Sequence, residues 1–312
     1  MSTVKVGRLP LRFERENKWV ITLPFFHGGE ARVRSIFERV AELPDRDVDT
    51  LVQSVYDRFE HRHSSLEQSL EEDYSLAAKM LGEPTPPSQN RRRLIGSYFT
   101  MEYAIASAAL FNPSIVPHPN QSSVAPGALR FIMSLRATGE GHVSSIVFRR
   151  GVIEADSSIH VDPPASQPRR ARRSDDQSYV KSLFRRKLHE MKLDQKATDL
   201  VLNRLQDQFT ITELEHAIVE TRRSRPEEMR LEETAEGIRW LARENYRFRF
   251  PDDADVSHLV IFPQSDNEIR GIEDLRMVRF VDDDGKVTYF GTYNAYNGYR
   301  VLPQLMETTD LH

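Results

Sequence analysis

The sequence of 312 residues contains no cysteine, and it has no apolar run of the roughly 18 residues that a membrane-spanning helix needs. The lack of cysteine excludes disulfides, thiolate metal sites and thiol nucleophiles, and it is compatible with any compartment. The opening residues, MSTVKVGRLPLRF, lack the apolar core of a signal peptide. We therefore expect a cytoplasmic protein with no membrane partner.

An excess of positive charge is also missing, because 43 Lys and Arg residues stand against 47 Asp and Glu residues and the formal net charge is −4. Proteins that grip nucleic-acid phosphates concentrate basic charge, so no nucleic-acid partner is expected. The basic cluster RRARR at 169–173 lies between prolines and two aspartates. We interpret it as a solvated loop. If it instead contacted nucleic acid, retention on DNA would depend strongly on salt.

Several common functional motifs are missing from the sequence. It has no P-loop, no dinucleotide-binding glycine fingerprint, no HExxH and no EF-hand loop. His61 and His63 are two positions apart in a predicted helix, so they do not share a face and predict no metal site. No segment of the sequence resembles a nucleophile elbow. A Ser/His/Asp triad built from residues that are distant in sequence is not excluded.

The first 110 residues predict an extended segment followed by helices. Aromatic and β-branched residues in 4–26 predict one or two short strands that end at the glycine pair 28–29. The apolar residues that follow recur at helical spacing. They predict helices over 36–43, 48–59, 66–81 and 94–108.

The rest of the chain predicts two β regions that flank a second helical block. The runs ALRFIMSLRA and VSSIVFRRGVIEA, separated by TGEGH, predict a β-hairpin or part of a small antiparallel sheet in the first region. In the helical block, Thr212 and Glu215 have capping-box spacing, and Pro226 suits the start of the last helix. In the last region, the turn residues 283–285 predict a second hairpin.

These patterns predict an α+β chain in four parts. The parts are an N-terminal extended and helical region, a first β region, a linker with a helical insertion, and a second β region. Their predicted boundaries are 1–110, 111–160, 161–245 and 246–312.

The strongest candidate for chemistry is the segment GIEDLR at 271–276. In a regular strand, Glu273 and Asp274 point to opposite faces, whereas Asp274 and Arg276 share one face. Spacing alone favours a structural ion pair between Asp274 and Arg276. A general acid must be protonated when it acts. A guanidinium beside the Asp274 carboxyl favours the ionised form instead, so the proximity of Arg276 conflicts with a role of Asp274 as acid.

Three separated segments resemble glycoside hydrolase family 130, especially its longer members with helical additions. They are FNPSIVPHPN at 111–120, LRFIMSLRATGEGHVSSIVFRRG at 129–151 and GIEDLRMVRFVDDDGKVTYFGTYNAYNG at 271–298. The resemblance covers roughly residues 111–151 and 258–310. It departs from the family pattern at Leu275, where proline or alanine is usual, and at Asn297, where aspartate is frequent.

The resemblance implies part of a five-bladed β-propeller, with about two blades present, that acts on β-mannoside oligosaccharides. The reaction would be phosphorolysis, with inorganic phosphate as co-substrate, or inverting hydrolysis, and no metal or other cofactor is expected. Asp274 matches the catalytic aspartate that protonates the glycosidic oxygen. The substrate-binding positions implied by the matching segments are Asn112, Arg136, Arg276 and Tyr293.

The resemblance also bears on completeness, because the family's remaining blades follow the position that matches His312. We therefore expect the chain as given to be catalytically incomplete, and an open strand edge to favour a homo-oligomer. The alternative is a non-catalytic carbohydrate-binding or protein-interaction module in which the helices supply the partner surface. Release of mannose 1-phosphate or mannose from β-mannosides discriminates between the two.

Overall fold

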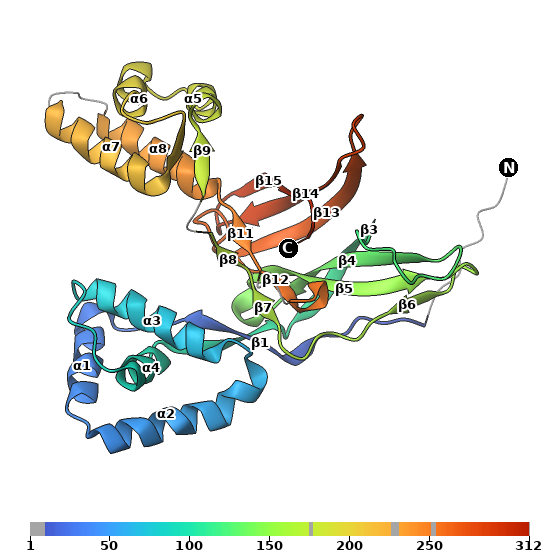
Figure 1. Ribbon diagram of the computed structural model, residues 1–312, viewed down its shortest axis with the longest axis horizontal. Coiled ribbons are helices and arrows are strands. Elements are labelled where there is room, and N and C mark those ends of the chain that lie inside the picture. Colours follow the sequence, from blue (N-terminus) through green and yellow to red (C-terminus); the bar gives the residue numbers. More distant parts are fainter. Residues whose placement is uncertain (1–9, 175–176, 226–230, 251–253, 312) are drawn as a thin grey trace. The chain divides into compact units, whose positions relative to one another are not determined.

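The computed structural model describes residues 10–174, 177–225, 231–250 and 254–311, and they form two compact units (Figure 1). The first unit comprises Met1–Arg170, Pro251–Pro263 and Arg270–His312, and the second comprises Ala171–Phe250 and Gln264–Ile269. The chain therefore leaves the first unit twice, once for residues 171–250 and again for residues 264–269. The predicted insertion over 161–245 overlaps the second unit.

Four helices form the N-terminal part of the first unit: α1 (Gly29–Ala41), α2 (Asp45–Phe59), α3 (Leu66–Met80) and α4 (Gln89–Ser97). The first three confirm the predicted helices. Their apolar stripes meet in one cluster that includes Val33, Val48 and Tyr74. Gly96 allows α4 to lie directly on α3, because a Cβ there would come within 1.9 Å of the Leu70 carbonyl oxygen.

The predicted helix over 94–108 is wrong in its second half. Helix α4 ends at Ser97, and residues Thr100–Ala106 form strand β2, which pairs antiparallel with β1 (Glu16–Pro24). The apolar residues Met101 and Ile105 fit helical spacing, but Tyr103 and Ile105, two positions apart, also pack into the same apolar cluster. The sequence therefore fits both a helical and a strand periodicity, and hydrogen bonding to β1 selects the strand.

A branched nine-stranded sheet forms the rest of the first unit. Its strands are β3 (Ala109–Pro117), β4 (Leu129–Thr138), β5 (Ser144–Ile153), β6 (Ile159–Val161), β7 (Arg169–Arg170), β12 (Leu259–Ile261), β13 (Gly271–Val281), β14 (Val287–Tyr296) and β15 (Val301–Thr308). Strands β3 to β6 are antiparallel neighbours in sequence order, and so are β13 to β15. One edge of β5 pairs successively with β13, β12 and β6.

Both predicted hairpins are confirmed. Strands β4 and β5 pair along their whole length across the turn that contains the short 3-10 helix η2 (Glu140–His142). Strands β13 and β14 pair across a turn in which Asp282 Oδ1 accepts hydrogen bonds from the backbone N–H groups of Asp284 and Lys286. Gly285 adopts φ 80° there, a conformation that glycine tolerates.

The second unit is mainly helical, with α5 (Lys181–Glu190), α6 (Gln195–Leu202), α7 (Ile211–Ser224) and α8 (Leu231–Glu244) around their own apolar core. Short strands β9 (Ser178–Val180) and β10 (Gln208–Thr210) pair beside them. The capping box of α7 uses Thr210 and Glu213, so the predicted pair Thr212 and Glu215 is wrong by two residues. The predicted helix start at Pro226 lies outside the described residues.

The interpretation of RRARR as a solvated loop is also wrong. Residues Arg169–Arg170 form β7, which pairs with β12, and Arg172–Arg173 form β8, which pairs with β11 (Phe248–Arg249). All four arginines are partly buried. The guanidinium of Arg173 lies 5.0 Å from the Tyr246 ring centroid and donates to the Arg243 carbonyl oxygen.

The expected mixture of helices and sheets is confirmed: the described residues form eight α-helices and several sheets, and no sheet among them closes into a barrel. No helix in the described part of the chain has both the length and the apolarity needed to cross a bilayer.

Candidate functional site

Asp274 lies at a β-bulge in the β13–β14 pair. The register runs from Glu273 opposite Asn294 to Arg276 opposite Thr292, so Asp274 and Leu275 together oppose Tyr293. Asp274 has φ 56°, while Leu275 is only 1% exposed and anchors the bulge in the core. An extra residue of this kind interrupts the alternation of side chains along a strand. The bulge thereby re-aims the Asp274 carboxyl.

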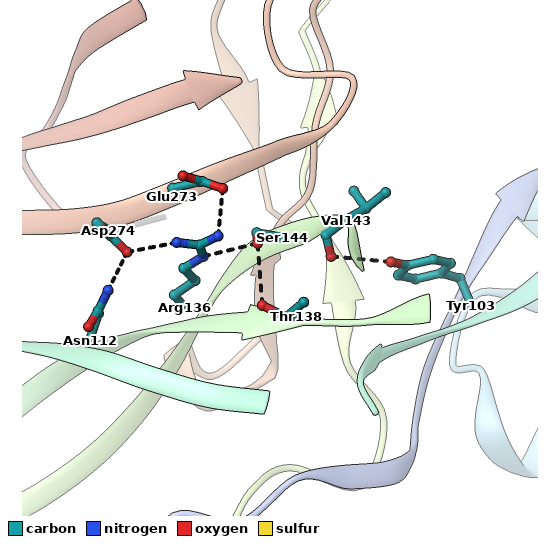
Figure 2. A network of polar contacts seen from close by, with 8 residues as sticks. All are labelled: Tyr103, Asn112, Arg136, Thr138, Val143, Ser144, Glu273 and Asp274. Carbon is teal, nitrogen blue, oxygen red and sulfur yellow. Dashed lines mark hydrogen bonds and ion pairs between the residues drawn. The ribbon is translucent and has the colours of Figure 1, made fainter. Parts of the chain in front are cut away.

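Asn112 lies at a second bulge, in the β3–β4 pair. Phe111 opposes Arg136 and Ser114 opposes Ser134, which leaves Asn112 and Pro113 opposite a single residue of β4. The φ of Asn112 is 54°. The side-chain amide Nδ2 of Asn112 donates a hydrogen bond to Oδ1 of Asp274 (Figure 2). Two bulges from separate hairpins therefore bring these two side chains together.

Arg136 of β4 completes the cluster. Its Nη1 lies 3.3 Å from Oδ1 of Asp274, and its Nη2 lies 2.5 Å from Oε1 of Glu273 (Figure 2). Its Nε donates to Ser144 Oγ at 3.0 Å, and its guanidinium carbon lies 4.9 Å from the Phe111 ring centroid. Arg136 is therefore held on four sides, and its side chain is 19% exposed.

The two oxygens of Asp274 have different environments. Oδ1 accepts hydrogen bonds from both Asn112 and Arg136, whereas Oδ2 accepts none from any described residue. The side chain of Asp274 is 36% exposed, more than that of Arg136 or Glu273. Oδ2 is thus the oxygen of Asp274 that has no hydrogen-bond donor among the described residues.

The turn between β4 and β5, which Tyr103 contacts, leads directly into Ser144 and so holds a partner of Arg136 in place. Ser144 Oγ, which binds Arg136, also lies 3.3 Å from Thr138 Oγ1. The Tyr103 hydroxyl donates to the Glu140 carbonyl oxygen at 2.6 Å. It also lies 3.2 Å from the Val143 carbonyl oxygen (Figure 2). Burial raises the pKa of Tyr103 to about 12, so its hydroxyl remains a donor at neutral pH.

The two remaining predicted residues, Arg276 and Tyr293, lie on β13 and on its partner strand β14. The ion pair expected between Asp274 and Arg276 does not form, because the bulge breaks their common face and Arg136 supplies the guanidinium. Arg276 donates instead to the Pro113 carbonyl oxygen at 2.7 Å. Tyr293 is partly buried on β14, opposite the bulge.

Sequence reasoning missed Glu273 as a member of this cluster. Strand alternation placed it on the face opposite Asp274, and nothing in the sequence around 273–275 announced a bulge. It also missed Ser144, whose position opposite Thr138 at the end of the β4–β5 pair follows only from the register of the hairpin.

Two other features lie outside this cluster. A hollow of about 510 Å³ is lined by polar residues including His118, Arg130, Arg150 and Asp255, and none of the cluster's residues lines it. No group of three or more metal-binding side chains occurs within the residues that the structure describes.

Comparisons with known proteins found no match, whether to a protein-family model, to a curated protein or to a solved structure.

Proposed function

We propose that this chain carries the proton-donating site of an enzyme that transfers a mannosyl group from a β-mannoside to inorganic phosphate or to water. Asp274 is the proton donor in this proposal. Asn112 and Arg136 orient its carboxyl, while Arg276 and Tyr293 contribute to the sugar-binding surface. The substrate class comes from the resemblance to glycoside hydrolase family 130.

One observation supports the proposal above all others: Asn112, Arg136 and Asp274 meet at one carboxyl oxygen. Asp274 lies 162 residues after Asn112 and 138 after Arg136, and the three residues come from the segments that resemble the family. A structural ion pair at the surface needs no second hairpin and no pair of bulges. The convergence of donors on Oδ1 leaves Oδ2 accessible, as an acid catalyst requires.

The chemistry follows from this geometry. Oδ2 of Asp274 gives its proton to the glycosidic oxygen, directly or through a sugar hydroxyl, while the bond from that oxygen to the anomeric carbon breaks. The bond electrons remain on the leaving oxygen. An oxygen of phosphate or water attacks the opposite face of the anomeric carbon. Phosphate is itself the nucleophile, so phosphorolysis needs one protein carboxyl, whereas inverting hydrolysis needs a second one to activate water.

The finer fold is part of the same proposal. The antiparallel series β3 to β6 and β13 to β15 have the local order of strands in propeller blades. We assign these two series to two blades of a five-bladed propeller, with the site at the point where β5 meets β13.

The deciding experiment compares the parent chain with Asp274→Asn on β-mannosides. It measures mannose 1-phosphate in phosphate buffer and free mannose in buffer without phosphate. We expect the substitution to lower turnover on the order of a hundredfold or more, because it removes the transferable proton. Asp283→Asn is the matched control, since Asp283 is an exposed turn residue of the same hairpin.

Two outcomes contradict the proposal in different ways. Turnover that survives Asp274→Asn rules out Asp274 as the acid. Binding of a β-mannoside without turnover in the parent chain supports the non-catalytic carbohydrate-binding alternative instead.

A further inference from the structure

The guanidinium of Arg136 lies between two carboxylates, and the closer one is not the proposed acid. Nη2 is 2.5 Å from Glu273 Oε1, whereas Nη1 is 3.3 Å from Asp274 Oδ1. Both Coulomb attraction and hydrogen bonding weaken with distance. Arg136 therefore makes its stronger interaction with Glu273.

The bulge at Asp274 is what allows this arrangement. In a regular strand, consecutive carboxylates point to opposite faces and cannot both reach one guanidinium. Here the register shift between Glu273 and Arg276 turns Asp274 so that both carboxylates contact Arg136. Among the described residues, Arg136 is the one cation that forms an ion pair with either carboxylate.

This sharing of charge matters for a group that must give up a proton. A cation beside a carboxyl favours its ionised form, yet an acid catalyst has to start from the protonated form. Because Glu273 and Arg136 form a pair with no formal charge, Asp274 meets a weaker positive field than a lone guanidinium would produce. The hydrogen bonds that orient Asp274 are retained.

We infer that Glu273 is a positioning residue that anchors Arg136 and balances its charge, so that Arg136 orients the Asp274 carboxyl with a charge that is already shared with Glu273. This inference rests on the proposed function, because it gives Glu273 a task in proton donation. Ser144 and Phe111 hold the other sides of Arg136 and carry no charge, so Glu273 alone supplies the balance.

The first test uses Glu273→Gln and two substrates that differ in their need for an acid. The leaving sugar of a mannosyl disaccharide requires protonation, whereas the leaving group of a dinitrophenyl β-mannoside requires none. We expect kcat/KM of the variant to fall about tenfold or more on the disaccharide and to stay within about threefold on the aryl mannoside. Glu273→Asp keeps the charge and is expected to restore most of the lost rate.

The matched control is Glu215→Gln in the second unit. Arg239 also lies between two carboxylates there, at 2.9 Å from Glu215 and 2.7 Å from Glu236. This control removes the same charge from the same kind of pair, and we expect both rates to stay unchanged.

Suppose first that Asp274→Asn abolishes turnover of the disaccharide. The inference is then overturned if Glu273→Gln lowers kcat/KM equally on the two substrates, or on neither. If Asp274→Asn leaves that turnover intact, the proposed function itself fails. The two failures are therefore distinguishable.

A second measurement does not depend on turnover. The coupling between Arg136 and Asp274 is obtained from urea unfolding of the parent, Arg136→Gln, Asp274→Asn and the double variant. The same cycle is then repeated with Glu273→Gln in every chain. Charge balancing predicts a larger coupling when Glu273 is neutralised, seen as a larger difference between the effect of the double substitution and the sum of the two single effects. An equal or smaller coupling refutes the charge-balancing role.

Discussion

Two residues of the site, Asn112 and Asp274, have left-handed backbone conformations, with φ of 54° and 56°. Among the residues other than glycine, asparagine and aspartate tolerate this backbone region best. Their identities are therefore constrained by the backbone as well as by chemistry. Asp274→Asn keeps the backbone preference and removes the transferable proton, so the loss of activity that we expect from it is chemical in origin.

A second carboxyl, that of Asp73, is buried away from the site. Its residue is 4% exposed on α3, and Oδ2 accepts a hydrogen bond from Thr100 Oγ1 at 2.5 Å. Burial raises the pKa of Asp73 to about 6, although the Thr100 hydrogen bond and the charge of Arg170 oppose the shift. The folded chain thus holds this proton at a pH where the unfolded chain has released it.

The raised pKa of Asp73 predicts a stability that depends on pH. Its contribution is fully present below the unfolded pKa of 3.8 and is lost as the pH rises through about 6. The variant Asp73→Asn cannot ionise at this position. Its free energy of unfolding should therefore rise relative to that of the parent chain, by up to about 3 kcal/mol between about pH 4 and pH 8. Urea unfolding across this range measures the difference. Parallel pH curves for the two chains would show that Asp73 is not the titrating group.

At the scale of one element, the start of α7 shows how tertiary context selects a cap. The Thr210 hydroxyl accepts from the Glu213 N–H, and the Glu213 carboxylate accepts from the Thr210 N–H at 2.7 Å. Thr212 and Glu215 have the same spacing but lie inside the helix. Strand β10 ends at Thr210, which places the first unpaired N–H groups of α7 there.

This capping box is tested by comparing two threonines. Thr210→Ala should lower the free energy of unfolding by about 1 kcal/mol, because it leaves an N–H group of the first turn without its acceptor. Thr212→Ala removes the same atoms from the first turn without removing a cap, so a much smaller effect is expected. Thermal unfolding of both variants gives the comparison, and equal losses would contradict the assignment of the cap.

At the scale of the whole molecule, each unit has its own apolar core. The core of the second unit gathers side chains from α5 to α8 and β10, including the fully buried Leu202 and Ile218. The first unit has separate clusters in its helices and beneath its sheet. We therefore expect the units to lose protection against hydrogen exchange separately.

Leu202→Ala tests this separation. It removes a fully buried side chain and should destabilise the second unit by about 2–5 kcal/mol. Amide exchange should then accelerate within 171–250 and stay unchanged in the β4–β5 hairpin. Val219→Ala is the control, because Val219 is mostly exposed on α7. Faster exchange in both places would show a single cooperative unit.

The sequence by itself determined the elements whose signals are local. The helices over 48–59 and 66–81 follow from apolar residues that recur every three or four positions. The β13–β14 hairpin follows from an aspartate and glycine turn between two β-rich runs. Such preferences act between near neighbours in the chain, so they can be read without knowing the fold. The GIEDLR segment already drew attention to Asp274, the resemblance added Asn112 and Arg136 as candidates, and the structure brings these three together.

Only the tertiary structure decided the features that depend on pairing between distant segments. Strand β2 replaces a predicted helix because β1 supplies its hydrogen-bond partners. Arg136, rather than Arg276, pairs with Asp274 because bulges in two hairpins change which side chains share a face. A register shift of one residue reverses the direction of a side chain and leaves no trace in composition or period. Three candidate residues that lie together could therefore be named from the sequence, but their contacts could not.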